Sequence, residues 1–487
     1  MRSWLRSPFD SDEELTRSLE EKSQRIVGAD SNSKLDLILG VPKGARSMIQ
    51  GIMLVLDDLL AGLKRVCGAF PDKRSGGPAT YSMADIGLSA FAPFFMQCES
   101  FLSYQRQLED GHGASNCQTL FGMARIPTDN HIRSMLDPVH PRHLQPCFDD
   151  AVAALRKNGG MKAFHRLGGR TLIALDGVEY FCSYTINCPH CLTRKRNNGK
   201  VESYHTMLSA SIVAPGHAMV VPLMPEFIAP RDGADKQDCE RNAAKRWLAM
   251  HASRVADLRP IYLGDALFAC QPLAQAVVRT GADFIFVCKP DGHKTLYDFI
   301  DGAKLDESKV TQRHPGNKRL TYHYRWIEDV PIRDGKDALN VNWIAVTITD
   351  AKGKTTYDGA FVTSLPIGKD NVAELVACAR ARWKIENETF NVLKNHGYHL
   401  EHNFGHGKQH LAMMFAAMNL LAFALHTVCD CLEELWQKAR AAKGSRKRFF
   451  EHIRTIAAYL VFPSWDVLWE TLIASKPPPD LKKMCAL

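Results

Sequence analysis

Two apolar runs, each followed by an aspartate, constrain this 487-residue chain most strongly. The first reads TLIALDG and leads to Asp176, and the second reads IYLGDALF and leads to Asp265. Apolar runs of this length are typical of buried strands. Open α/β sheets bind ligands beyond the carboxyl ends of their strands. The pattern therefore predicts a mixed α/β fold, with each carboxylate at the carboxyl end of a central strand.

A later segment, ARWKIENETFNVLKN, supplies a third carboxylate on a predicted helix that Asp370 would cap. Arg382, Glu386 and Lys394 follow one another at intervals of four or eight residues, so they share one drifting stripe of that helix. Glu388 would point roughly 200° away from Glu386. The alternative interpretation of the stripe is a chain of surface ion pairs.

Three carboxylates suit a nuclease that uses two metal ions. Two divalent cations roughly 3.5–4 Å apart can activate an attacking oxygen and stabilise the leaving oxygen of a phosphodiester. Mg²⁺ prefers oxygen ligands, so Asp176, Asp265 and Glu386 are predicted to hold two Mg²⁺ or Mn²⁺ ions. Either aspartate alone could instead serve only as a turn or helix cap.

These residues resemble those of the DDE transposases of bacterial insertion sequences, in particular the insertion-sequence-four-like type. That type marks its catalytic helix with Tyr, two residues, Arg, three residues, Glu, six residues and Lys. Here Arg382 and Glu386 have this spacing, whereas Ala379 stands at the tyrosine position and Lys394 falls one residue late. The tracts PEFIAPRDGADKQDCERNAAKRWL and LKNHGYHLEHNFGHG extend the resemblance, which runs from about residue 120 to about residue 430.

The resemblance implies a transposase that cuts and joins the ends of an insertion sequence by phosphodiester hydrolysis and strand transfer. Asp176, Asp265 and Glu386 would be its catalytic residues and metal ligands. Its partners would be double-stranded DNA, both terminal inverted repeats and target DNA, and a second copy of the chain on paired ends. Two other classes stay open: a metal-dependent nuclease on the same core without strand transfer, and a DNA-binding protein derived from a transposase. No Walker-type loop is present, so ATP is not implied.

DNA contacts are expected from basic and aromatic residues. Arg382 would hold a phosphate by its two-pronged guanidinium and Lys394 as a point charge. The resemblance implies that a tryptophan of the β insertion, Trp326 or Trp343, stacks on a flipped base, although both also suit a core position. Basic residues elsewhere could form a solvated face or contact phosphates; the candidates are Lys236, Arg194 and Arg196.

Patterning and the resemblance together predict an RNase-H-like α/β core interrupted by a β-rich insertion. The expected order in the first part of the core is three antiparallel strands, a helix and a parallel strand. The predicted segments are a helical N-terminal domain that could bind DNA ends or act as a scaffold (1–165), the first part of the core (166–291), the antiparallel β insertion (292–369), the catalytic helix with the helices after it (370–430), and a helical basic C-terminal segment (431–487).

One cysteine cluster stands out among the fourteen cysteines. The tract FCSYTINCPHCLTRKR holds Cys182, Cys188 and Cys191, and Cys-x-x-Cys is half of a structural zinc site. Cys182 together with His205 or Cys239 could complete four ligands. The alternatives are a zinc-free turn with buried thiols, or a thioredoxin-like redox pair, which would need a helix after the two cysteines.

Composition and termini bear on the compartment. The net charge is +8, and the N-terminal stretch SDEELTRSLEEK is acidic, unlike a secretory signal peptide. The longest apolar run, 412–425, is interrupted by Asn419 and is too short to span a bilayer, so it is predicted to be a core helix. A cytoplasmic protein with no membrane partner is expected, associated with the nucleoid when it is bound to DNA.

Overall fold

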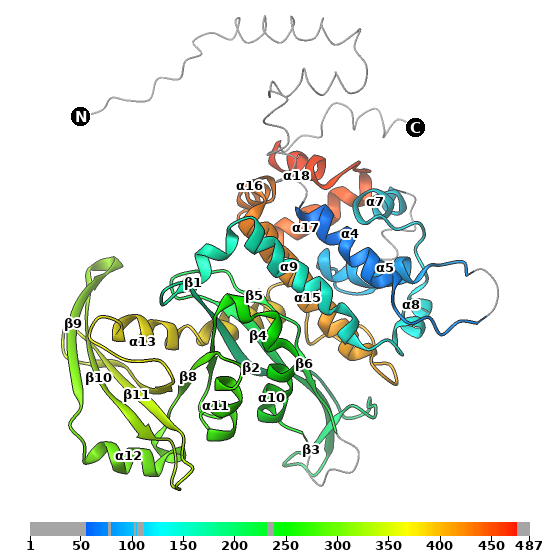
Figure 1. Ribbon diagram of the computed structural model, residues 1–487. Coiled ribbons are helices and arrows are strands. Elements are labelled where there is room, and N and C mark those ends of the chain that lie inside the picture. Colours follow the sequence, from blue (N-terminus) through cyan, green and yellow to red (C-terminus); the bar gives the residue numbers. More distant parts are fainter. Residues whose placement is uncertain (1–54, 76–78, 102–103, 105–111, 231–237, 475–487) are drawn as a thin grey trace, which may run out of the picture. The chain divides into compact units, whose positions relative to one another are not determined.

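The computed structural model describes residues 55–75, 79–101, 104, 112–230 and 238–474 (Figure 1). These residues belong to one compact unit of the chain that begins at Val55. The first 54 residues of the predicted N-terminal domain, the last 13 residues of the predicted C-terminal segment and the candidate Lys236 lie outside the described residues. Helices and strands alternate along much of the described chain, so the predicted mixed α/β class is confirmed.

Helices dominate both ends of the described chain. They are α4 (Val55–Gly68), α5 (Met83–Phe95), α7 (His112–Phe121), α8 (Asp129–Leu136), α9 (Gln145–Lys157), α10 (Glu240–His251), α11 (Gln271–Val278), α12 (Lys294–Asp301), α13 (Val372–Arg380), α14 (Asn391–Asn395), α15 (Leu411–Leu432), α16 (Glu434–Lys443), α17 (Arg446–Tyr459) and α18 (Trp465–Ala474). A π-helical segment, η7 (Ile385–Phe390), precedes α14.

The strands of the described residues form one twelve-stranded sheet. They are β1 (His165–Arg166), β2 (Arg170–Ser183), β3 (Leu192–Lys195), β4 (Val201–Val213), β5 (Val221–Pro222), β6 (Glu226–Ile228), β7 (Pro260–Gly264), β8 (Asp283–Val287), β9 (Asp306–His314), β10 (Lys318–Pro331), β11 (Asn340–Asp350) and β12 (Thr355–Thr363). The main path through the sheet is β3-β4-β2-β7-β8-β12-β11-β10-β9.

The middle of the sheet combines both strand directions. Strand β2 pairs antiparallel with β4 and parallel with β7, and β7 pairs parallel with β8. All five residues of β7 are buried, which explains its unbroken apolar sequence, because a strand covered on both faces has no polar side. Helices α10 and α11 pack against each other and against these strands (Figure 1).

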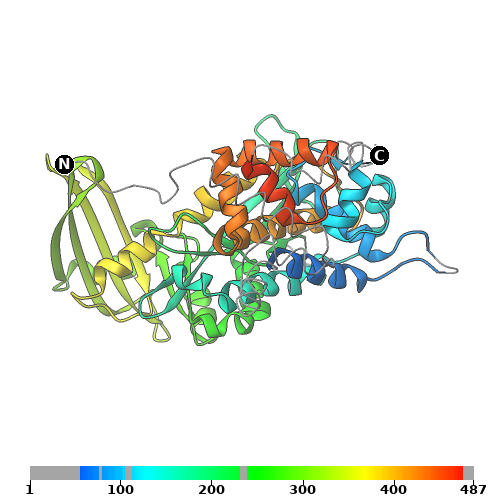
Figure 2. The same cartoon turned by 90° about the horizontal axis from the view of Figure 1, so that it is seen from above.

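Four antiparallel strands, β9 to β12, extend the sheet beyond β8. Strand β12 pairs antiparallel with β8, and β11, β10 and β9 follow in order. Strand β11 is mostly buried, whereas β9 at the sheet edge is mostly exposed. Helix α13, which comes next in the chain, packs against β8 and β11 (Figure 2).

Helix α15 forms the centre of the helical part and packs against α5, α9 and β5. Among the described residues it is the one helix with the length and apolar character to cross a membrane, and 94% of its most apolar window is buried inside the protein. Its apolar sequence therefore serves internal packing, as predicted for the run 412–425. Asn419 is buried with it and donates a 2.8 Å hydrogen bond to the carbonyl of Tyr398.

The predicted continuous helix over the segment with Glu386 is wrong in detail. Helix α13 ends at Arg380, turn residues follow, and η7 and α14 come after them. The residue at the start of α13 is Asn371 rather than Asp370, and its side-chain Oδ1 accepts a 2.8 Å hydrogen bond from the Gly368 amide. Arg382 therefore sits at the turn between two helices.

Candidate active site

The pairing of β2 with β7 places Asp176 beside Asp265. The parallel register matches Ala174 with Leu263, and the pairing ends there. Two residues further along each chain stand the two aspartates, at the point where the two strands separate. Strand β2 itself continues to Ser183, so the expectation that Asp176 ends its strand is wrong. Asp176 instead lies within β2, opposite Ser209 of β4.

Both aspartates also bind the backbone near them. Asp176 Oδ1 accepts a 2.9 Å hydrogen bond from the Gly177 amide, and Asp265 Oδ1 accepts a 2.8 Å hydrogen bond from the Leu267 amide. The second contact is the turn role that was the alternative interpretation for Asp265. Each aspartate uses one carboxylate oxygen in this way, which fixes the carboxylate and leaves the other oxygen for a different partner.

Arg382 joins the aspartate of β2 to the glutamate of η7. Its Nη1 lies 3.2 Å from Asp176 Oδ2 and 2.7 Å from Glu386 Oε1. Arg382 is only 7% exposed, so it is not a surface ion-pair partner. Removing Arg382 would leave two carboxylates without their cation, and such a loss in a buried ion pair typically costs about 3–5 kcal/mol. One guanidinium thus holds two of the three predicted carboxylates together.

The surroundings of Asp176 disfavour its charged form. Burial raises the pKa of Asp176 to about 7; Arg382 opposes this rise, and the charges of Asp265, Glu386 and Glu240 add to it. A single buried cation therefore does not balance the negative charge gathered here. A site of this kind favours either a proton or an additional cation near Asp176.

Glu240, the first residue of α10, is a fourth carboxylate that the sequence did not single out. A side chain at position 177 would overlap the Glu240 carboxylate, so glycine after Asp176 permits their close approach. Burial and the charge of Asp265 raise the pKa of Glu240. The available signal was the glycine directly after Asp176, because a glycine within a strand often marks a close approach.

The two glutamates of η7 face different surroundings. Glu386 contacts Arg382 beside Asp176, whereas Glu388 lines a separate cavity of about 940 Å³ together with Asn391, His396 and Arg446. Segment η7 packs against β2 and β4. The predicted separation of Glu386 from Glu388 is therefore present, although the turn between them is π-helical.

Three basic residues that were predicted to bind DNA form ion pairs with carboxylates of the protein itself. Arg194 contacts Glu179 at 2.6 Å, and Arg196 contacts Glu202 at 2.9 Å. Lys394 Nζ lies 2.7 Å from Glu401.

The tryptophans proposed for base stacking lie in the core. Trp326 and Trp343 are each 3% exposed, so neither offers a ring face to solvent. An exposed aromatic residue lies beside Arg382, which contacts two of the carboxylates. Trp383 is 54% exposed, and the guanidinium of Arg382 lies 5.6 Å from its ring centre. Trp383 lies in the tract ARWKIENETFNVLKN, and no role was predicted for this ring.

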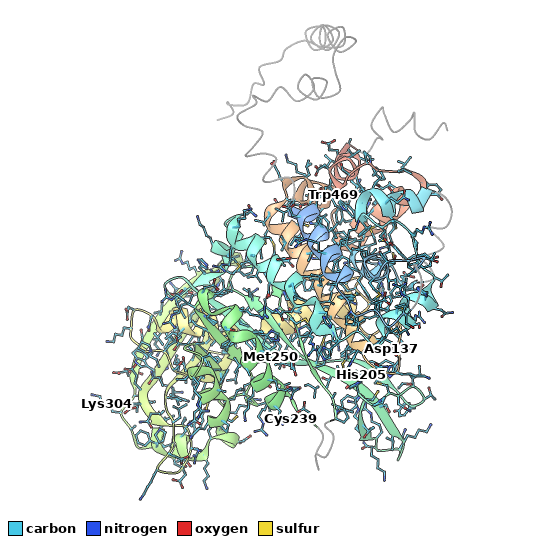
Figure 3. The ribbon with its side chains drawn as sticks, turned by 45° about the vertical axis from the view of Figure 1, so that its right-hand side comes forward. Asp137, His205, Cys239, Met250, Lys304 and Trp469 are labelled. Atoms are coloured by element: carbon cyan, nitrogen blue, oxygen red, sulfur yellow. The ribbon has the colours of Figure 1, made fainter. Side chains whose placement is uncertain are left out.

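Two cysteines and two histidines form a second cluster beyond the carboxyl end of β2. Cys188, Cys191, His205 and His406 each offer a ligand atom, and all four atoms lie within 4.8 Å of one another. This group could hold a metal ion. The predicted ligand Cys182 is exposed and outside the cluster, so that part of the zinc prediction is wrong. Cys239 is exposed and lies apart from His205 (Figure 3), and His406 supplies the fourth ligand atom instead.

The raised pKa of Asp176 predicts a pH-dependent penalty on folding. Because the pKa is about 7 in the folded protein against an ordinary 3.8, the folded state binds the proton more tightly, and stability falls as pH rises between these values. Asp176→Asn should therefore raise the thermal midpoint by a few degrees at pH 8, from about 1–3 kcal/mol of relief. The difference should vanish near pH 4. Thermal scans in buffer without added divalent cations measure it; equal midpoints at pH 8 would contradict the burial argument.

No model of a known protein family matches this chain, and no curated protein matches it in sequence. A function for the acidic cluster is therefore inferred from its own geometry and from the spacing of its residues.

Proposed function

We propose that this chain is a DNA transposase that cuts and joins the ends of an insertion sequence by metal-dependent phosphoryl transfer. One observation carries the proposal. Segments far apart in the sequence bring Asp176, Asp265 and Glu386 to one place, through the register of β2 with β7 and through the bridge made by Arg382. A scaffold that gathers like charges at an energetic cost is typical of a functional site.

The donor set suits hard divalent cations. All four acidic side chains at the site offer oxygen, which Mg²⁺ and Mn²⁺ prefer. Asp176, Asp265 and Glu386 would hold the ions, two for each site, and Glu240 lies near enough to Asp265 to add negative charge. When bound, such ions activate an attacking oxygen and stabilise a leaving oxygen of a phosphodiester.

The chain's own residues have separate tasks in this scheme. Asp176 would have to lose its proton to hold a cation, so cation affinity should rise with pH. Arg382 neutralises Asp176 and Glu386, and its guanidinium would be free to bind a phosphate of the DNA if bound cations replaced it there. Water attacks the phosphorus at the transposon end, and the departing strand keeps a 3′-hydroxyl. That hydroxyl then attacks a second phosphodiester, forming one P–O bond as another breaks, so no ATP is needed.

The strand order supports an RNase-H-like core. Strands β2, β4 and the short β5 and β6 are antiparallel neighbours, helix α10 follows, and β7 and β8 run parallel to β2. This is the order expected for that core. Strands β9 to β12 lie in the chain between Asp265 and Glu386, where the resemblance places a β-rich insertion.

The π-helical segment offers a reason for the late lysine. A π turn takes up one extra residue inside a helix and is frequent at functional sites. Segment η7 begins one residue before Glu386 and ends at Phe390, four residues before Lys394, and Lys394 falls one residue later than the spacing of the resembled transposases. The extra residue is absorbed by the π turn, so the departure does not speak against the proposal.

A strand-transfer experiment tests the proposal. The full chain would be incubated with Mg²⁺ or Mn²⁺ and linear DNA that carries the sequences flanking its gene, together with a plasmid target. We expect nicks at the element ends that leave a 3′-hydroxyl, joining of those ends to the plasmid, and a dimeric complex on paired ends.

Other results would replace the proposal with a different class. Cleavage at any sequence without joining would indicate a metal-dependent nuclease. End binding without cleavage in either metal would indicate a DNA-binding protein derived from a transposase. DNA with scrambled end sequences serves as the control, because a transposase should neither nick nor join it.

A further inference from the structure

We propose that Cys188, Cys191, His205 and His406 bind one structural Zn²⁺ ion. The two cysteines lie in the turn between β2 and β3, His205 is on β4, and His406 lies in the loop before α15. The inference does not depend on the proposed activity. It adds a ligand from a segment about two hundred residues away from the cysteines, which the cysteine spacing alone could not identify.

Four of the six distances between ligand atoms are close to the edges of a tetrahedron, and all six are at most 4.8 Å. Zinc lies about 2.3 Å from sulfur and about 2.0–2.1 Å from nitrogen, so ideal tetrahedral edges are about 3.8 Å for S–S and about 3.6 Å for S–N. Here the two sulfurs are 3.8 Å apart. His205 Nε2 lies 3.4 Å from each sulfur, and His406 Nε2 lies 3.5 Å from Cys191 Sγ. A disulfide would need the sulfurs at about 2.05 Å.

The surroundings favour a closed metal site. Cys191, His205 and His406 are buried, and the rings of Tyr180 and Phe181 lie against the imidazoles. The Nε2 atoms of both histidines are directed at the sulfurs. With four protein ligands there is no open position for a substrate, and such closed sites are structural rather than catalytic.

The His406 loop is positioned without any metal. The Asp137 carboxylate accepts hydrogen bonds from the amides of Lys408 and Gln409 at 3.0 and 2.9 Å. The carbonyl of Asp137 also accepts a 2.9 Å hydrogen bond from the His410 amide. Asp137 and His205 lie in the same region of the protein (Figure 3). Because this loop is already fixed, His406 loses little conformational freedom when it becomes a ligand.

Zinc at this position would fasten two parts of the fold. The turn that holds the two cysteines directly follows β2, the strand that carries Asp176. The His406 loop follows η7 and α14, and η7 carries Glu386. A β-bulge between Glu179 and Phe181 separates the metal-binding end of β2 from the acidic site. The ion would hold the antiparallel pair of β2 and β4 against the loop before α15, and so support the site without taking part in its chemistry.

Metal analysis and cobalt substitution test this inference. Purified full chain should contain about one zinc per molecule. Protein loaded with Co²⁺ should show the strong visible absorption and the sulfur-to-metal charge-transfer band of a tetrahedral site with two thiolates. His406→Ala and Cys188→Ser should each lower zinc affinity at least tenfold in a chelator competition and reduce the thermal midpoint, because loss of a single ligand weakens the whole site.

Matched controls come from the cysteines that sequence spacing also suggested. Cys182→Ser and Cys239→Ser should keep full zinc content and an unchanged cobalt spectrum. The inference fails if wild-type protein binds neither metal, if Cys188 and Cys191 are isolated as a disulfide, or if His406→Ala leaves both zinc affinity and the cobalt spectrum unchanged. The cobalt spectrum of wild-type protein decides the matter even if a variant does not fold.

Discussion

Replacing Asp176, Asp265 or Glu386 by its amide should abolish DNA cleavage while leaving binding to end DNA nearly intact. An amide keeps the size of the side chain but removes the negative charge that a divalent cation needs. Loss of a residue that only supports a metal ligand costs about 10- to 100-fold, so we expect loss of a ligand itself to cost at least about 1,000-fold in cleavage rate. Each amide variant is compared with wild type in single-turnover cleavage and in a binding titration.

Two other glutamates provide matched controls. Glu388 is two residues from Glu386 but lines a different cavity, so Glu388→Gln should cleave like wild type. Glu240 lies beside Gly177 and adds negative charge to a site that would hold divalent cations, so Glu240→Gln should reduce cleavage without abolishing it. Normal cleavage by Glu386→Gln together with loss of cleavage in Glu388→Gln would show that Glu388, and not Glu386, is the active glutamate. Loss of DNA binding in all variants would instead point to misfolding.

The two aspartates could be foreseen because strand periodicity and parallel pairing are local and regular. An apolar run that ends in Asp predicts a buried strand, and two parallel neighbours in register bring their following residues together, as Ala174 and Leu263 show. The strand that continues past Asp176 was not foreseen. Among the described residues its second half pairs only with β4, from Gly177 with Leu208 to Ser183 with Ser203, and that pairing depends on a partner strand distant in the sequence rather than on the local pattern.

The residues that sequence missed depend on distant contacts. Glu240 reaches the site because Gly177 leaves room for it, and His406 reaches the cysteines because Asp137 holds its loop. Neither contact leaves a periodic trace in the sequence. The π turn at Ile385–Phe390 is likewise not predicted by helix patterning; its trace in the sequence is Lys394, which falls one residue late.

Arg382 is buried and is bonded to both Asp176 and Glu386. Its charge lowers the pKa of Asp176, against the larger effect of burial. Without that charge Asp176 would hold its proton to higher pH, and cation binding, which requires the carboxylate, would need more alkaline conditions. The same guanidinium would bind a phosphate of the DNA in the complex. Removal should therefore affect both pH dependence and DNA binding.

For Arg382→Ala we expect cleavage at pH 7 to fall at least tenfold, with partial recovery as pH is raised towards 9. The slope of log binding constant against log salt should become shallower by about 0.9 for the lost phosphate contact. Arg382→Lys should restore cleavage only in part, since an ammonium cannot make two parallel bonds. Arg254, which pairs with Asp149 at 2.7 Å on the exposed surface, gives the control: Arg254→Ala should change neither cleavage nor salt slope. Wild-type cleavage, pH profile and salt slope in Arg382→Ala would leave this guanidinium a structural tie, and would remove the phosphate contact from the proposed mechanism.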